Sequence, residues 1–153
     1  MRKLKKVLSV LMCAVCLTLI VSCDTTKKET ASKKPELAKS LVQVVDNLVI
    51  ITVDDDYFEI TDKTVLLDYM QALKTDGAID FTVKDGMITA INGQENPADW
   101  SKCWMLYSND SELSNEAWGT VTVDGITYFS AVLGAEVLPI KDGKKYVWEF
   151  KSF

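Results

Sequence analysis

The sequence contains no histidine. This absence excludes His-based catalytic triads, most catalytic zinc sites and the most common general base. The loop carboxylates of Asp99, Glu112 and Glu116 also lack a spacing that indicates paired acid–base chemistry. The sequence therefore predicts a protein that is not an enzyme and that carries no metal ion or cofactor.

Charged side chains are missing from Val7 to Ser22, where Leu, Val and Ile dominate, and four basic residues precede this run. A membrane-spanning helix needs about 20 apolar residues, so the run is short for a span. Its length and its basic flank are instead typical of a secretory signal peptide. We expect residues 1–22 to be a signal peptide that is cleaved after the small residue Ser22.

The four residues Ile20-Val21-Ser22-Cys23 resemble the lipobox of bacterial lipoproteins. The resemblance implies diacylation of the Cys23 thiol, cleavage before Cys23, and a lipid-anchored protein on the extracytoplasmic face of the cell membrane. Acyl chains contribute about 0.8 kcal/mol per buried CH₂, so two or more long chains hold a protein firmly at a bilayer. The alternative is an ordinary signal peptide, or an uncleaved anchor, in which Cys23 has no role.

Removal of the signal segment changes the charge and the number of thiols. Loss of its four basic residues takes the net charge from −5 to −9, which argues against nucleic-acid binding and against an electrostatic grip on anionic lipid. Cys13 and Cys16 leave with the signal, so Cys103 is the remaining thiol and no disulfide can form within the mature domain. For Cys103 a buried apolar role is favoured over a reactive thiol or a metal ligand, because no partner that would activate it is evident.

Residues 24–36 contain no Val, Leu, Ile or aromatic residue. Such a segment cannot bury enough apolar surface to offset its ordering entropy, which predicts a flexible tether over residues 23–36. A single folded domain is expected over residues 37–153. The alternative at the junction is a short helix over residues 36–45 that docks on the domain.

The pattern of apolar residues predicts an α+β domain with a mostly antiparallel sheet and one packed helix. The helix is expected over residues 63–75, with Thr61 or Asp62 as its N-cap and Gly77 just past its end. Asp85-Gly86 and Asp124-Gly125 predict two-residue hairpin turns. Strands are expected over residues 48–53, 79–83, 87–91, 103–108, 121–123, 126–128 and 146–150.

Three consecutive carboxylates, Asp54 to Asp56, follow the first of these strands. A calcium loop has alternate ligands, a glycine bend and a distal glutamate, and none of these is present. A solvated hairpin tip that leads into residues 57–60 is therefore favoured over a calcium site.

Blocks of the domain also resemble the DUF4430 family, also called transcobalamin-like C-terminal domains. The match covers roughly residues 48–153 and rests on Thr64-Val65-Leu66-Leu67-Asp68-Tyr69-Met70, Ile88-Thr89-Ala90-Ile91-Asn92-Gly93, Trp104-Met105-Leu106-Tyr107-Ser108-Asn109, and the ending Gly134, Leu138-Pro139-Ile140, Asp142-Gly143, Tyr146-Val147-Trp148. The resemblance implies a β-grasp-like fold on a secreted or lipid-anchored bacterial protein. In eukaryotic cobalamin carriers the related domain packs against one face of the corrin ring. This chain lacks the large helical domain that completes that site, and its polar stretch at residues 109–116 is longer than the connection in the family.

Four aromatic residues are candidate ligand contacts: Trp100, Trp118, Tyr107 and Tyr128. Together they would form a platform for a flat ligand, since burial on Trp and Tyr carries much of the binding energy at such sites. The alternative is that most of them are core residues, and Trp104 is expected in the core. Trp100 and Trp118 flank loops and are the more exposed candidates. We therefore expect a lipoprotein with a non-catalytic ligand-binding domain, for a cobalamin-like or other flat ligand, or alternatively a protein-interaction or surface-adhesion module.

Overall fold

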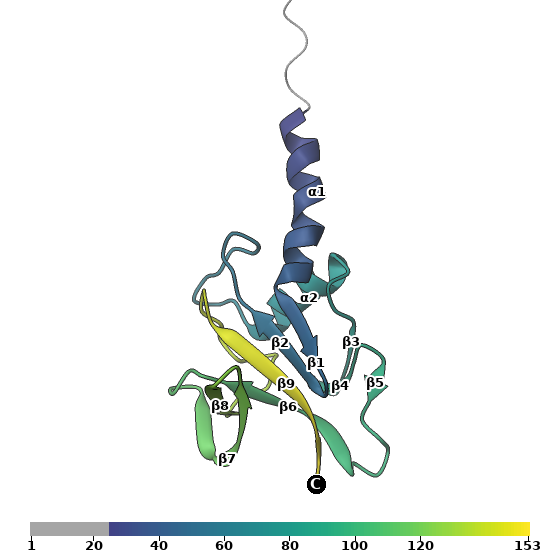
Figure 1. The fold of residues 1–153 in the computed structure, drawn as a ribbon, viewed down its shortest axis with the longest axis vertical. Coiled ribbons are helices and arrows are strands. Elements are labelled where there is room, and N and C mark those ends of the chain that lie inside the picture. Colours follow the sequence, from purple (N-terminus) through teal and green to yellow (C-terminus); the bar gives the residue numbers. More distant parts are fainter. Residues whose placement is uncertain (1–24) are drawn as a thin grey trace, which may run out of the picture. The chain divides into compact units, whose positions relative to one another are not determined.

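The computed structural model describes residues 25–153, with side chains from Lys33 onward. Residues Lys33–Phe153 form one compact unit. The predicted signal peptide (1–22) and the proposed lipidation site Cys23 lie outside the described residues. The elements, labelled in Figure 1, are α1 (Thr25–Ser40), β1 (Val42–Val45), β2 (Leu48–Thr52), α2 (Leu66–Thr75), β3 (Phe81–Lys84), β4 (Met87–Ile91), β5 (Gln94–Glu95), β6 (Lys102–Ser108), β7 (Ser114–Val123), β8 (Ile126–Ala131) and β9 (Lys145–Ser152).

Two antiparallel sheets make up most of the unit. The larger sheet has six strands in the order β1-β2-β9-β6-β8-β7, and the smaller has the order β3-β4-β5. The last strand, β9, lies between β2 and β6, pairing Tyr146 with Ile51 on one side and Phe150 with Trp104 on the other. The predicted α+β class with a mostly antiparallel sheet is confirmed.

The main core lies between one face of the six-stranded sheet and α2 with the small sheet. From α2 it takes Leu66, Tyr69, Met70 and Leu73, all fully buried. Full burial of such a side chain contributes about 1.5–3 kcal/mol to folding. Three aromatic residues of β9 also belong to this face: Tyr146 and Trp148 are part of the core, and Phe150 packs against it.

The second face of the six-stranded sheet is covered as well. Ile50, Tyr107, Tyr128 and Val147 form a smaller buried cluster there, against which side chains of β7 pack. The centre of the sheet is therefore buried on both faces. This arrangement explains the continuous apolar runs at residues 48–51 of β2, 103–107 of β6 and 146–148 of β9.

The helix α2 ends as predicted but begins later than predicted. At its end Gly77 has φ +72°, and the N–H groups of Gly77 and Ala78 donate to the carbonyls of Lys74 and Leu73. This is the Schellman arrangement, which only glycine adopts without strain. At its start the N-cap is Val65, whose N–H donates to the carboxylate of Asp68. The expected caps Thr61 and Asp62 instead lie in the preceding turn.

The hairpin turns predicted from Asp-Gly pairs are confirmed. Asp124 and Gly125 both have positive φ and place Val121 opposite Tyr128 and Val123 opposite Ile126, in the expected register. Asp85-Gly86 joins β3 to β4 in the same way. Asn92-Gly93 is a further turn of this kind, which leads into β5.

Two segments differ from the sequence prediction. Residues 57–60 form no strand, so the hairpin expected at Asp54–Asp56 is wrong; the carbonyl of Asp54 accepts the N–H groups of Tyr57 and Phe58, and Tyr57 turns into the core. The predicted tether is helical from Thr25, where α1 begins. Lys, Glu and Ala are good helix formers, so a segment with few apolar residues can still be helical. The alternative of a helix that docks on the domain is right for residues 36–40, because α1 runs to Ser40 and its residues Leu37 and Ala38 pack in the main core. It is wrong for the residues beyond, where β1 lies.

Candidate functional site

A groove of about 300 Å³ lies beside Trp100, and we call it the Trp100 groove. Its walls come from the turn between β3 and β4, from β6, and from the segment that follows β8. None of the residues that line it is charged, and its principal lining side chains are Met87, Trp100, Cys103, Met105, Leu133 and Trp148. Its volume is at the lower end of the range for small-molecule sites, and its apolar lining is typical of them.

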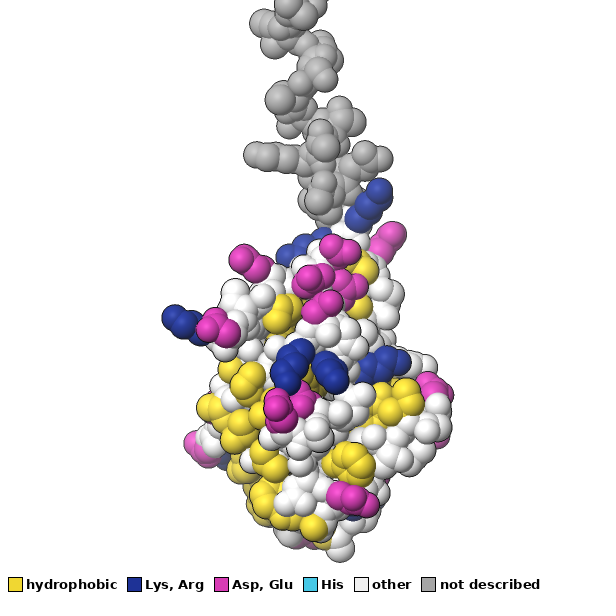
Figure 2. All heavy atoms as spheres, turned by 90° about the vertical axis from the view of Figure 1, so that its left-hand side faces the viewer, with side chains coloured by type: hydrophobic (Ala, Val, Ile, Leu, Met, Phe, Trp, Pro, Cys, Tyr) yellow, Lys and Arg dark blue, Asp and Glu magenta, His cyan; other side chains and the backbone are white. Residues whose placement is uncertain are grey.

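Several exposed hydrophobic side chains converge on this groove. Met87, Trp100, Val132 and Leu133 line it, and each is between 37% and 50% exposed. Figure 2 shows one face of the molecule, where hydrophobic side chains gather with charged side chains beside them. Scattered apolar residues are normal on a protein surface, whereas a contiguous group marks an interaction site.

The backbone at Trp100 is strained. Its φ is +56°, in the left-handed region that bulky residues rarely adopt, and its side chain is 50% exposed. The loop holds it there by two local contacts: Trp100 N–H donates to the carbonyl of Pro97, and the Asp99 carboxylate accepts from the N–H and the hydroxyl of Ser101. The hydrogen bonds from Ser101 keep the pKa of Asp99 below its ordinary value. A strained aromatic residue presented to solvent is an observation that points to function rather than to stability.

The turn at the edge of the groove favours glycine because of its backbone conformation. Gly86 has φ +79°, and a methyl group added there would lie 2.9 Å from Glu136 Oε2. That carboxylate is the end of a flexible, exposed side chain and can move aside, so the positive φ is what favours glycine here. The residue after the turn, Met87, lines the groove, as does Leu133.

Two sulfur atoms lie together in the wall formed by β6. Cys103 Sγ is 3.6 Å from Met105 Sδ, and the thiol is half-buried rather than fully buried as expected. Burial raises the pKa of the Cys103 thiol, so it is protonated at neutral pH. Methionine side chains adapt their shape to what they contact, which suits a groove that accepts varied apolar groups.

A second hollow, of about 460 Å³, adjoins the first and shares Asn96 and Trp100 with it. Its lining includes Lys84 and Glu95, so it is more polar. The indole of Trp100 therefore stands between an uncharged groove and a polar one.

The structure divides the four predicted aromatic contacts. Trp100 and Trp118 are exposed as expected, at 50% and 61%. The assignment of Tyr107 and Tyr128 as ligand contacts is wrong, because they are 0% and 1% exposed and belong to the cluster under the second face of the sheet. Trp104 is a core residue as expected, and its Nε1 donates to the carbonyl of Gln94, joining the two sheets.

Trp118 is exposed for a different reason from Trp100. Pairing between β7 and β8 stops at Asn115 and resumes at Thr120, so the residues 116–119 bulge out of the sheet. The side chain of Asn115 accepts the N–H of Ala117 and closes the start of this bulge. Neither hollow beside Trp100 is lined by Trp118. The single aromatic platform predicted from the sequence is therefore not formed at the Trp100 groove.

Carboxylates also meet near the end of β2. Oxygens of Asp54, Asp55 and Asp142 lie within 4.8 Å of one another. Asp54 and Asp142 accept the backbone N–H groups of Asp56 and Asp55, which gives both a structural role in the turn. The sequence offered Asp54 to Asp56 for this position, and Asp142 was missed because it comes from a distant part of the chain.

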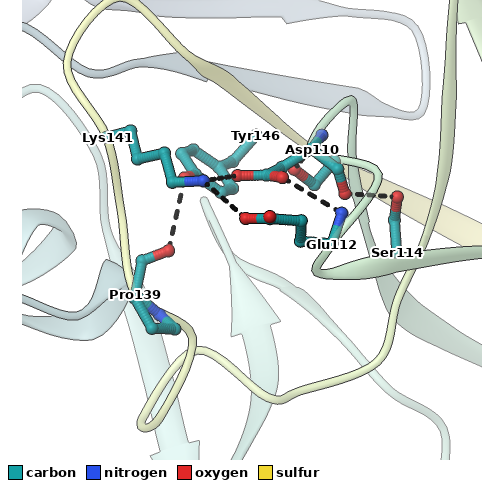
Figure 3. A network of polar contacts seen from close by, with 7 residues as sticks. Asp110, Glu112, Ser114, Pro139, Lys141 and Tyr146 are labelled. Carbon is teal, nitrogen blue, oxygen red and sulfur yellow. Dashed lines mark hydrogen bonds and ion pairs between the residues drawn. The ribbon is translucent and has the colours of Figure 1, made fainter.

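An ion pair between a buried carboxylate and a half-exposed lysine fixes the polar stretch that follows β6 (Figure 3). The Asp110 side chain is 6% exposed, and its Oδ2 lies 2.6 Å from Lys141 Nζ. Asp110 Oδ1 accepts the N–H of Glu112, and its carbonyl accepts the hydroxyl of Ser114. The hydrogen bond from Lys141 holds the pKa of Asp110 below its ordinary value. These contacts lead the chain into β7, so the cluster is structural.

Comparisons with protein-family models, with curated proteins and with solved structures find no match to this chain. Within residues 25–153, no helix is long and apolar enough to cross a membrane.

Proposed function

We propose that this chain is a lipid-anchored, extracytoplasmic bacterial protein whose α+β domain binds an apolar ligand in the Trp100 groove without catalysing a reaction. The observation that carries the ligand site is the convergence of exposed hydrophobic side chains on an uncharged groove, with Trp100 held there in a strained conformation. The anchor rests on the sequence around Cys23.

The lining defines the ligand. With no charged residue in the groove, a charged group placed there would lose its hydration and gain no partner. The indole of Trp100 offers a flat face for stacking. We therefore propose a neutral ligand with a planar or aliphatic body. A groove of about 300 Å³ takes the edge of a tetrapyrrole rather than the whole ring, so a cobalamin-like ligand would lie mostly outside it.

A titration tests this proposal. The probes are N-phenyl-1-naphthylamine, which is neutral and fluoresces when it enters an apolar site, and cobalamin, followed by its visible absorption band. We expect saturable binding of the naphthylamine probe and a raised melting temperature in its presence. Trp100→Ala should weaken binding at least tenfold, whereas Trp118→Ala, which removes another exposed indole that lies outside the groove, should leave binding unchanged. Equal loss in both variants, or no saturable binding to the unaltered protein, would refute the site.

One observation favours a protein-interaction module as a second candidate. The bulge at residues 116–119 directs Trp118 to solvent, and tryptophan is among the residues most enriched at binding hot spots. If this candidate is correct, Trp118→Ala abolishes attachment of the protein to intact cells or isolated envelopes, and Trp100→Ala does not. The same pair of variants thus separates the two functions.

A further inference from the structure

The strand β1 leaves one edge of the six-stranded sheet open. No strand among residues 25–153 pairs with its outer side. Just before β1, the N–H of Thr52 donates to the carbonyl of Leu41, so these two residues form a hydrogen-bonded pair. Such pairs occur at every second position of an antiparallel ladder, which means that Gln43 and Val45 are the residues of β1 that bond to β2. The N–H and C=O groups of Val42 and Val44 therefore point outward, away from the sheet.

This edge carries few of the features that prevent edge-to-edge pairing. The opposite edge, β7, is interrupted by the bulge at residues 116–119, whereas β1 has no bulge, proline or lysine. Val44 and Val45 are 58% and 41% exposed. Only the shortness of β1, at four residues, limits pairing.

We propose that β1 pairs with β1 of a second copy of this chain, antiparallel and about a twofold axis. In the register that uses every outward group, Val42 bonds to the partner's Val44, and Val44 bonds to the partner's Val42. This register forms four backbone hydrogen bonds and places Gln43 opposite its own counterpart. Val42 and Val44 lie on the face of the sheet that looks toward the main core, and Val42 already packs against this core. In the proposed register the exposed Val44 of one copy would pack against Val42 of the other.

Charge agrees with this pairing. The strand itself is uncharged, so pairing brings no like charges face to face in spite of the negative charge of the whole chain. Asp46 follows the last residue of β1, and Lys39 lies in the last turn of α1, just before β1 begins. Because the two strands run antiparallel in this register, Asp46 of each copy comes near Lys39 of the other. Opposite charges therefore lie at both ends of the shared ladder.

The contact is small, so it should form more readily between copies attached to one membrane than between copies in solution. Four direct hydrogen bonds are fewer than the about ten of a typical specific interface, so pairing is weak for freely diffusing molecules. Attachment to a membrane surface raises the effective concentration of one copy around another and favours such a contact. This part of the inference rests on the proposed lipid anchor, and the pairing geometry does not.

Disulfide trapping tests the pairing with the full lipidated chain in phosphatidylcholine vesicles, in a Cys103→Ser background. In the proposed register the two Gln43 positions form a non-hydrogen-bonded pair, with Cα atoms about 4.5 Å apart, which is within disulfide range. We expect Gln43→Cys to form a disulfide-linked dimer on mild oxidation with diamide at least tenfold faster than Gln94→Cys. Gln94 is the matched control, because it is an exposed glutamine on another edge strand, β5.

Val44→Pro gives a second readout. Its outward N–H bonds to nothing in the same copy, so proline there should remove the crosslink in the Gln43→Cys protein while leaving its melting temperature nearly unchanged. Equal crosslinking of Gln43→Cys and Gln94→Cys would overturn the proposal, as would a crosslink of Gln43→Cys to a different protein in cells. The trapping is repeated in solution at raised protein concentration, where the dimer is still expected. Failure of the anchor is seen separately, as protein that does not sediment with the vesicles.

Discussion

The strain at Trp100 can be measured by comparing two replacements of the same residue. Trp100→Ala and Trp100→Gly both remove the indole and its contacts, so their difference reports the backbone alone. The left-handed region costs a residue with a Cβ about 1–2 kcal/mol, and glycine occupies it freely. Glycine in turn gives the unfolded chain more freedom, which costs about 0.4–1 kcal/mol. With φ at +56°, Trp100→Gly should be more stable than Trp100→Ala by about 1 kcal/mol.

Urea denaturation followed by circular dichroism measures this difference. With a slope of about 1–3 kcal/mol per molar urea, 1 kcal/mol moves the midpoint by about 0.5 M. Trp118 provides the control, because it is also exposed and is not among the residues with positive φ. There the order should reverse, with the alanine variant more stable than the glycine variant by about 0.5–1 kcal/mol. An alanine variant at Trp100 that is as stable as the glycine variant would refute the claim that this loop stores strain to present an indole.

Three other predictions concern the core, the ion pair and the thiol. Leu73→Ala, at a fully buried position of α2, should lower the free energy of unfolding by about 2–5 kcal/mol in the same urea assay. Because the pKa of Asp110 is lower in the folded than in the unfolded state, its contribution to stability is present above the unfolded pKa and is lost as pH falls through the folded value. Lys141→Met should therefore lower the melting temperature at pH 7 and make it less dependent on pH in the acid range; an unchanged acid profile would contradict this. Cys103 should react with iodoacetamide more slowly at pH 7.5 than a free thiol does, because burial raises its pKa, and urea should restore the rate.

The sequence predicted correctly those elements that are determined by residues close together in the chain. The stripe of α2 with Gly77 after it, and the Asp124-Gly125 turn with its register, follow from contacts between residues close in the chain. The same is true of Trp104, whose inward direction follows from the alternation of β6. These patterns depend on φ angles and periodicity, which neighbouring residues determine.

The errors arose where distant segments decide the outcome. Alternation along β6 places Tyr107 on the face opposite Trp104, but only the packing of β7 and β8 shows that this second face is buried too. The bulge that exposes Trp118 interrupts the pairing of β7 and β8 and has no signature in its own residues beyond Gly119. The role of Asp110 depends on Lys141, which lies beyond two intervening strands. Among the residues that line the groove, the sequence analysis identified Trp100 as an exposed candidate. It could not show that Met87 and Leu133, which are far apart in the chain, line the same groove.

The four tryptophans of the chain fall into two pairs with opposite surroundings. Trp104 and Trp148 are buried in the core, and Trp100 and Trp118 are half or more exposed. The emission of the protein should therefore be the sum of a blue component that acrylamide quenches poorly and a red component that it quenches well. Replacing Trp118 by phenylalanine would leave Trp100 as the source of the quenchable light. The domain would then carry its own optical reporter at the wall of the groove, with no label attached.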